Sequence, residues 1–179
     1  MAPRDYDMEA AAAAVVDRVP EDITRALIVQ PPGALHATMG GALRGLFGRN
    51  KRRAGLNQRN VLVLTPTSVR LYACEAHDWP PRATDDLGAW PVDGVRIATV
   101  AKEKHSTHSV QGSVTAKFYV ITLTVPGTPD PIEVECPRTD SARETILAIE
   151  DATGSRPSKV TARRRAKRER DASEHMEGR

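Results

Sequence analysis

The sequence predicts a β-rich α+β fold, in which an antiparallel curved sheet or partly open barrel is closed by a C-terminal amphipathic helix. Two patterns predict it: short apolar runs separated by turn residues between residues 61 and 136, and one apolar helical stripe after them. Aromatic residues make up only 4% of the chain, so we expect a core of Val, Leu, Ile and Ala. With 179 residues the chain can form one domain plus some unpacked chain.

The chain opens with an alanine-rich stretch. Residues 8–18 predict a short helix because alanine loses no side-chain entropy there, and Pro20 limits it. Residues 23–30 favour a strand by their length and β-branched content, with a helical turn as the alternative. We therefore expect an N-terminal helix and linker over residues 1–21, followed by a β domain over residues 22–154.

A glycine-rich, basic insertion is expected at residues 33–60. Its apolar residues recur at helical spacing, but each glycine in a helix costs roughly 1 kcal/mol relative to alanine. The segment is therefore either a helix that needs a surface to lie on or irregular chain. Those apolar residues are Leu35, Met39, Leu43, Leu46 and Phe47.

The strand pattern is clear from Val61 onward. Residues 61–74 predict a hairpin that turns at Thr65-Pro66-Thr67-Ser68. Residues 75–88 are predicted to form a polar loop, and residues 90–100 one or two short strands. Residues 101–113 are predicted to form an exposed loop or a hairpin tip.

The last two strands are predicted at residues 117–125 and 132–136. On the first of these, four residues share one face: Tyr119, Ile121, Leu123 and Val125. On the second, Glu133 and Glu135 alternate with apolar residues, which predicts one face in water.

A helix is expected after Pro137, over residues 141–153. Thr139, Asp140 or Ser141 can cap it, and Ser141 with Glu144 has capping-box spacing. Gly154 is expected to end this helix. Its apolar stripe comprises Ala142, Ile146, Ile149 and Ala152. Residues 155–179 have no apolar periodicity, so we expect a disordered or partly helical basic tail that adds nothing to folding.

No catalytic, cofactor or metal motif is found. The sequence contains neither a nucleophile elbow nor a phosphate-binding loop, and Cys74 and Cys136 are too far apart for a metal knuckle. His105 and His108 stand among lysines, which repel cations, so a solvated loop is the preferred reading. We expect a protein that is not an enzyme, with no small-molecule substrate.

The positive charge is concentrated in two segments. The chain carries +3 overall, but residues 44–59 hold six basic residues and no acid, and residues 155–179 hold nine basic and four acidic residues. Subtracting +6 and +5 from +3 leaves −8 for the rest. Two binding sites follow as candidates: Arg49, Lys51, Arg52, Arg53 and Arg59 for an anionic surface or partner, and Arg163, Arg164, Arg165, Lys167 and Arg168 for a polyanion.

The hairpin 61–72, the segment Trp90-Pro91-Val92-Asp93-Gly94-Val95 and the strand–strand–helix ending together resemble the pleckstrin-homology-like superfold. The hairpin LVLTPTSVRLY is similar to those of its small bacterial and GRAM-type members. The resemblance implies binding of lipid headgroups, peptides or proteins rather than catalysis. Eukaryotic lipid-binding members cluster Lys and Arg between their first two strands, as residues 49–59 do here, but the spacing differs and headgroup specificity is not implied.

The sequence thus favours a non-enzymatic binding or scaffolding domain that contacts a protein partner or an anionic membrane surface. The alternative is a nucleic-acid-associated accessory protein that uses its basic tail. Asp5, Asp7 and Glu9 are acidic where a secretory leader would be basic, and no apolar run approaches the ~18 residues of a membrane span. We therefore expect a cytoplasmic protein, with peripheral attachment to the inner face of the membrane as a variant.

Overall fold

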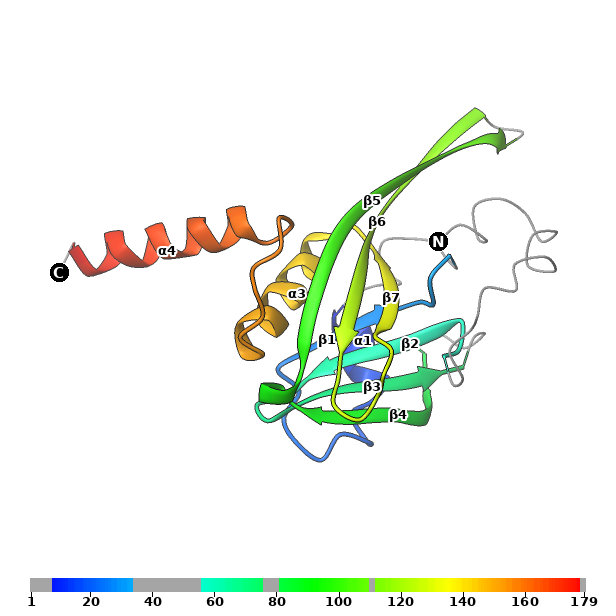
Figure 1. Ribbon diagram of the computed structural model, residues 1–179, viewed down its shortest axis with the longest axis horizontal. Coiled ribbons are helices and arrows are strands. Elements are labelled where there is room, and N and C mark those ends of the chain that lie inside the picture. The colour runs from blue at the N-terminus through cyan, green and yellow to red at the C-terminus, as the bar shows by residue number, and fades with distance from the viewer. Residues whose placement is uncertain (1–7, 34–55, 76–80, 110–111, 178–179) are drawn as a thin grey trace.

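Two antiparallel sheets and their helices form the protein (Figure 1). The computed structural model describes residues 8–33, 56–75, 81–109 and 112–177. The first sheet has the strand order β1-β2-β3-β4 and the second the order β5-β6-β7. The elements are α1 Met8–Ala13, β1 Arg25–Val29, β2 Arg59–Leu64, β3 Ser68–Cys74, β4 Ala83–Pro91, a 3-10 helix Val92–Gly94, β5 Arg96–Ser109, β6 Gly112–Thr124, β7 Ile132–Pro137, α3 Asp140–Ala152 and α4 Ala162–Glu177.

The sheets meet on one side and stay apart on the other. Gln30, just after β1, forms an isolated antiparallel bridge with Glu135 of β7, and their backbone groups exchange hydrogen bonds of 2.8 and 2.7 Å. Within the described residues β4 and β5 belong to different sheets and do not pair. The β-rich α+β prediction is confirmed at this level, as an arrangement of two sheets and not a closed barrel.

The first sheet is buried on both faces. Its inner face packs against the second sheet and α3 through residues such as Leu27, Leu62 and Leu71. Its outer face is covered by α1 and the turn after it, where Ala11 and Val15 lie against the strands. Strands buried on both faces have continuous apolar sequences, as Val61–Leu64 does. The helix predicted at residues 8–18 is shorter, Met8–Ala13 followed by a turn, and it packs on the domain.

The predicted hairpin is confirmed with its turn. Leu64 faces Val69, and the Thr65 N–H donates to the Ser68 carbonyl at 2.9 Å. Glu21 fastens this turn, because its carboxylate accepts hydrogen bonds from the Thr67 hydroxyl at 2.6 Å and the Thr65 hydroxyl at 2.8 Å. These bonds lower the pKa of the Glu21 carboxyl.

One predicted loop is partly a strand, and one predicted loop or hairpin tip is a hairpin tip. The polar loop expected at residues 75–88 contains the first part of β4, which pairs with β3 through two register irregularities that break the alternation. Residues 101–113, expected as an exposed loop or a hairpin tip, form the far part of the hairpin β5–β6, which projects from the body in Figure 1.

The predicted helix after Pro137 is confirmed, and its cap is Thr139, one of the three residues expected there. The Thr139 hydroxyl accepts from the Ala142 N–H at 3.0 Å, and Ser141 and Glu144, which have capping-box spacing, lie inside the first turns of the helix. Ala142, Ile146 and Ile149 are buried as predicted, whereas Ala152 is exposed. Gly154, at φ 60°, follows the end of the helix.

Glu135 was predicted to face water and is buried, with 5% of its surface exposed. Its backbone pairs with Gln30, which places the side chain on a covered part of the sheet. Burial raises the pKa of its carboxyl. Period-two alternation cannot identify such a residue, because a strand that leaves one sheet to meet another is covered on both faces there.

Candidate functional site

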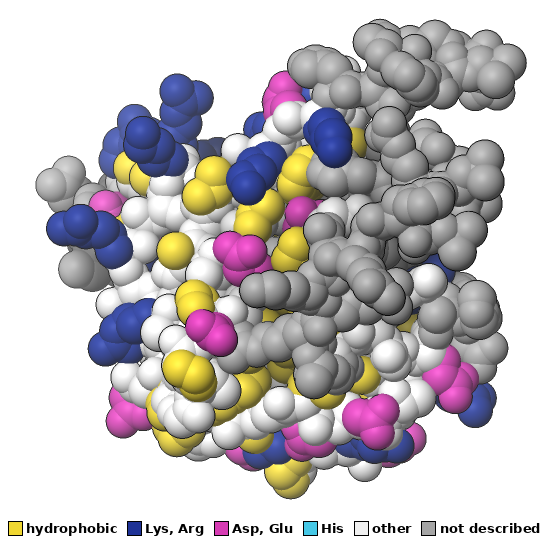
Figure 2. All heavy atoms as spheres, turned by 45° about the vertical axis from the view of Figure 1, so that its right-hand side comes forward, with side chains coloured by type: hydrophobic (Ala, Val, Ile, Leu, Met, Phe, Trp, Pro, Cys, Tyr) yellow, Lys and Arg dark blue, Asp and Glu magenta, His cyan; other side chains and the backbone are white. Residues whose placement is uncertain are grey.

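A groove of about 920 Å³ lies between β5, α3 and α4. Of the described residues that line it, six are basic and none is acidic. The basic ones are Arg138, Arg143, Lys159, Arg163, Arg164 and Lys167. Lys and Arg side chains also gather along one side of the face shown in Figure 2. Concave sites lined by one sign of charge concentrate ions of the opposite sign.

The floor of the groove is the β5 strand beside the Tyr119 side chain. Thr99, Val100 and Ala101 line it. Thr99 is 7% exposed, and within the described residues its hydroxyl oxygen has no hydrogen-bond partner. Val100 is 56% exposed, unusual for a large apolar side chain in this protein. The floor thus offers both an unsatisfied polar atom and an uncovered apolar side chain.

Two arginines of the groove are fixed by Tyr119. Arg143, on α3, donates from Nε to the Tyr119 phenol oxygen at 3.2 Å and from Nη1 to Asp140 at 3.0 Å. Arg138, just after β7, pairs with Glu103 at 2.9 Å and lies 5.8 Å from the centroid of the Tyr119 ring. Such contacts hold the two guanidinium groups in position at the floor.

The wall formed by α4 and the residues just before it carries the cations that make no ion pair within the described residues. Arg164 pairs with Glu144 and lies 3.9 Å from Asp140. Lys159, Arg163 and Lys167 make no ion pair with any described residue. Glu103, Asp140 and Glu144 offset three of the six cations, so the groove keeps a net charge of +3.

A buried carboxylate connects this wall to the domain. Glu150, on α3 and 1% exposed, accepts hydrogen bonds from the Ser158 N–H at 3.2 Å and from the Thr161 hydroxyl. Ser155 is also buried, and its hydroxyl accepts from the Ile97 N–H at 2.9 Å. Residues 155–161 are therefore packed on the domain, and we revise the expectation that the chain after Gly154 adds nothing to folding.

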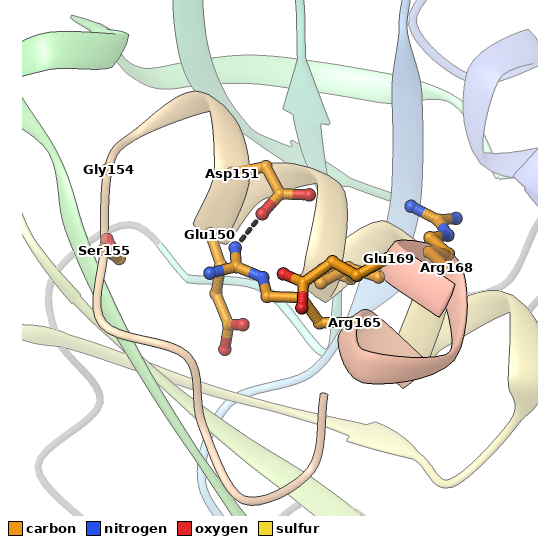
Figure 3. A pocket seen from close by; sticks show the side chains of 8 residues that line it. Glu150, Asp151, Gly154, Ser155, Arg165, Arg168 and Glu169 are labelled. Atoms are coloured by element: carbon orange, nitrogen blue, oxygen red, sulfur yellow. Dashed lines mark hydrogen bonds and ion pairs between the residues drawn. The ribbon is translucent and has the colours of Figure 1, made fainter. Parts of the chain in front are cut away.

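A second cavity, of about 520 Å³, lies on the other side of α4, between it and the end of α3 (Figure 3). Arg165 and Arg168 line it together with Asp151 and Glu169. Arg165 forms an ion pair with Asp151, drawn as a dashed line in Figure 3. Charges of both signs line this cavity, so it has no preference for anions.

The structure divides the predicted tail site in two. Arg163, Arg164 and Lys167 line the basic groove, whereas Arg165 and Arg168 line the second cavity. Of the other predicted site, Arg59 begins β2, and Arg49, Lys51, Arg52 and Arg53 lie outside the described residues.

Sequence reasoning missed three cations of the groove, Arg138, Arg143 and Lys159. They are scattered over 22 positions between β7 and α4, and no local charge run marks them. The other three cations of the groove belong to the basic run at residues 163–168, which the sequence did identify as a candidate site.

Across the described ranges, no group of three or more His, Cys, Asp and Glu residues could hold a metal ion, and no helix has the length and apolarity of a membrane span. Cys74 and Cys136 are both buried, and burial raises the pKa of the Cys74 thiol to about 11. Comparison with protein-family models, curated proteins and solved structures finds no match for this chain.

Proposed function

We propose that this protein is a non-enzymatic binding domain of pleckstrin-homology-like type whose basic groove holds an acidic segment of a partner protein. The observation that carries the proposal is the net charge of +3 in a concave site whose described lining includes no acidic side chain. A C-terminal helix packed against two antiparallel sheets supports the likeness to that superfold.

The shape of the site favours a protein segment over a membrane. A bilayer is a broad surface and meets protruding cations, whereas Arg138 and Arg143 are held at the floor of a groove by Tyr119. A narrow chain with carboxylates can enter the groove and reach both the floor and the α4 wall. Cytoplasmic location remains part of the proposal.

Nucleic acid is the rival ligand, because phosphates also bind clustered Arg and Lys. Single strands are usually held by stacking on aromatic rings, and the one aromatic side chain at the groove, Tyr119, is 1% exposed. Its ring is therefore not available to a base, and this observation favours the acidic protein segment.

The test is a charge reversal confined to the groove. Lys159, Arg163 and Lys167 are all changed to Glu, and binding of a fluorescein-labelled peptide of ten glutamates is measured by anisotropy at low and high salt. Exposed ion pairs contribute about 0.2–1 kcal/mol each. Losing three of them and adding repulsion should weaken binding at least tenfold.

The matched control makes the same charge change elsewhere on the tail. Arg156, Arg168 and Arg170 are changed to Glu; none of them lines the groove, so this variant should keep most of the wild-type affinity. Equal losses in both variants, or no binding of the peptide to wild type, would rule out the proposal. Tighter binding of a 20-base-pair DNA or of phosphatidylserine vesicles than of the peptide would assign the groove to that ligand instead.

A further inference from the structure

The outer edge of β5 presents unpaired backbone groups to the basic groove. β5 is the edge strand of its sheet, and the Ile97 N–H points away from β6 because it donates to the Ser155 hydroxyl. Backbone groups alternate direction along a strand, so those of Thr99 and Ala101 also point away from β6. The hydrogen bond from the Arg138 N–H to the Lys117 carbonyl fixes the same register from the other side of β6.

The part of this edge at residues 98–101, before Lys102, lacks the features that usually protect an edge strand. The free edge of the first sheet, β4, pairs irregularly with its neighbour and carries exposed Asp85 and Asp86. Residues 98–101 of β5 carry no charge, and their pairing with β6 is regular. Within the described residues, no hydrogen bond reaches the N–H of Thr99 or Ala101. An unprotected edge of this kind is a template for another strand.

The buried Thr99 hydroxyl points to the same conclusion independently. It lines the groove and has no partner among the described residues, although its residue is 93% buried (7% exposed). A buried polar atom without a partner is rare in folded proteins, because leaving it unsatisfied is costly. A ligand that lies along β5 would bring a polar group to this position.

We infer that the acidic segment binds in extended form, as a strand added to the free edge of β5, with alternate carboxylates directed at the α4 wall. This inference rests on the proposed function. The carboxylates on the side of the added strand that faces the groove then meet the cations that make no ion pair within the described residues, Lys159, Arg163 and Lys167.

Backbone N-methylation of the ligand tests the strand pairing. The probe is a labelled peptide of alternating Glu and Thr, nine residues long, and it is compared with two methylated forms. One form carries N-methyl groups on the Glu amides and the other on the Thr amides. In antiparallel addition, residues whose side chains face the groove also direct their N–H at β5. Methylation of the Glu amides should therefore weaken binding more than tenfold, and methylation of the Thr amides much less.

The possible results distinguish a failure of strand addition from a failure of the proposed function. A loss confined to the Thr-methylated peptide would also support strand addition, but in parallel orientation. Equal affinity of all three peptides, or equal loss in both methylated forms, would overturn strand addition while leaving the groove as an anion site if the charge reversal still abolishes binding. No binding of the unmodified peptide would overturn both.

A protein variant gives a second readout. Thr99→Val removes the unpartnered hydroxyl with almost no change of shape, so the melting temperature of the free protein should stay the same or rise. Peptide affinity should fall about threefold to tenfold, the loss expected for one hydrogen bond. Unchanged affinity would show that the ligand does not reach Thr99, and this result would overturn the proposed position of the strand.

Discussion

The hydrogen bonds of the buried Glu150 carboxylate predict that residues 155–161, which lead into α4, stabilise the domain. Thr161 is fully buried, and its hydroxyl donates to the Glu150 carboxylate. Thr161→Val keeps the volume and removes the donor, leaving the carboxylate with the Ser158 N–H as its remaining described partner. A buried polar group that loses its partner costs about 1–3 kcal/mol. In a chain of this length each kcal/mol lowers Tm by roughly 2–4 °C.

The assay is thermal and urea unfolding of wild type, Thr161→Val and a matched Thr→Val control. Thr128 is suitable, because its hydroxyl donates at 3.2 Å to the Val125 carbonyl in a partly exposed turn. The control should change the unfolding free energy by less than about 0.5 kcal/mol. Ending the chain at Gly154 removes both described partners of Glu150 and also Ser155, and should cost at least as much as Thr161→Val.

One result would refute this reasoning. If Thr161→Val and the chain ending at Gly154 both unfold at the wild-type midpoint, residues 155–161 do not stabilise the domain. The wall of the groove would then have no fixed position relative to β5. If Thr161→Val leaves the unfolding midpoint unchanged but the chain ending at Gly154 lowers it, another donor replaces the Thr161 hydroxyl at the Glu150 carboxylate.

Three further predictions concern the folded domain. Ile146→Ala in α3, at a fully buried site, should cost about 2–5 kcal/mol in urea unfolding, and an unchanged midpoint would contradict the packing of this helix. Glu21 has a lowered pKa, so its contribution is complete above its ordinary pKa of 4.5 and is lost as the pH falls through the lower folded value. Glu21→Gln should therefore lower stability at pH 7 and lose its effect at the lowest pH; an equal difference at both would exclude the carboxylate as the cause. Cys74 and Cys136 should react with a thiol reagent in urea and not in the native protein, and fast native labelling would show that their strands open.

The elements that sequence reasoning found are those with a local signal. The hairpin at residues 61–74 has two apolar runs around a Thr-Pro turn, and the helix after Pro137 has a stripe at the right period. Both are encoded by neighbouring residues. Strand β4 was missed because two irregularities in its pairing with β3 break the alternation of its side chains. For residues 101–113 the sequence left a loop and a hairpin tip open, because the segment is polar and has no periodicity.

The candidate site was only half predictable for a related reason. The tail run that includes Arg163 and Lys167 is visible as charge, but which of its residues face the groove depends on how Glu150 holds the start of α4. Arg138 and Arg143 become part of the site through Tyr119, more than eighteen positions earlier in the chain. Contacts of this kind between distant residues leave no pattern in the sequence.

The position of α1 over the outer face of the first sheet has a consequence for synthesis on the ribosome. The helix leaves the ribosome before any strand, and the face it covers needs β3, whose Tyr72 and Cys74 contribute to that core. Roughly 60 residues separate the end of α1 from the end of β3, which takes about 3–12 s at common translation rates. During that interval Ala11 and Val15 lack the part of their packing surface that β3 supplies. Chaperones that bind emerging apolar segments should therefore contact the first twenty residues, and release them once β3 has paired with β2.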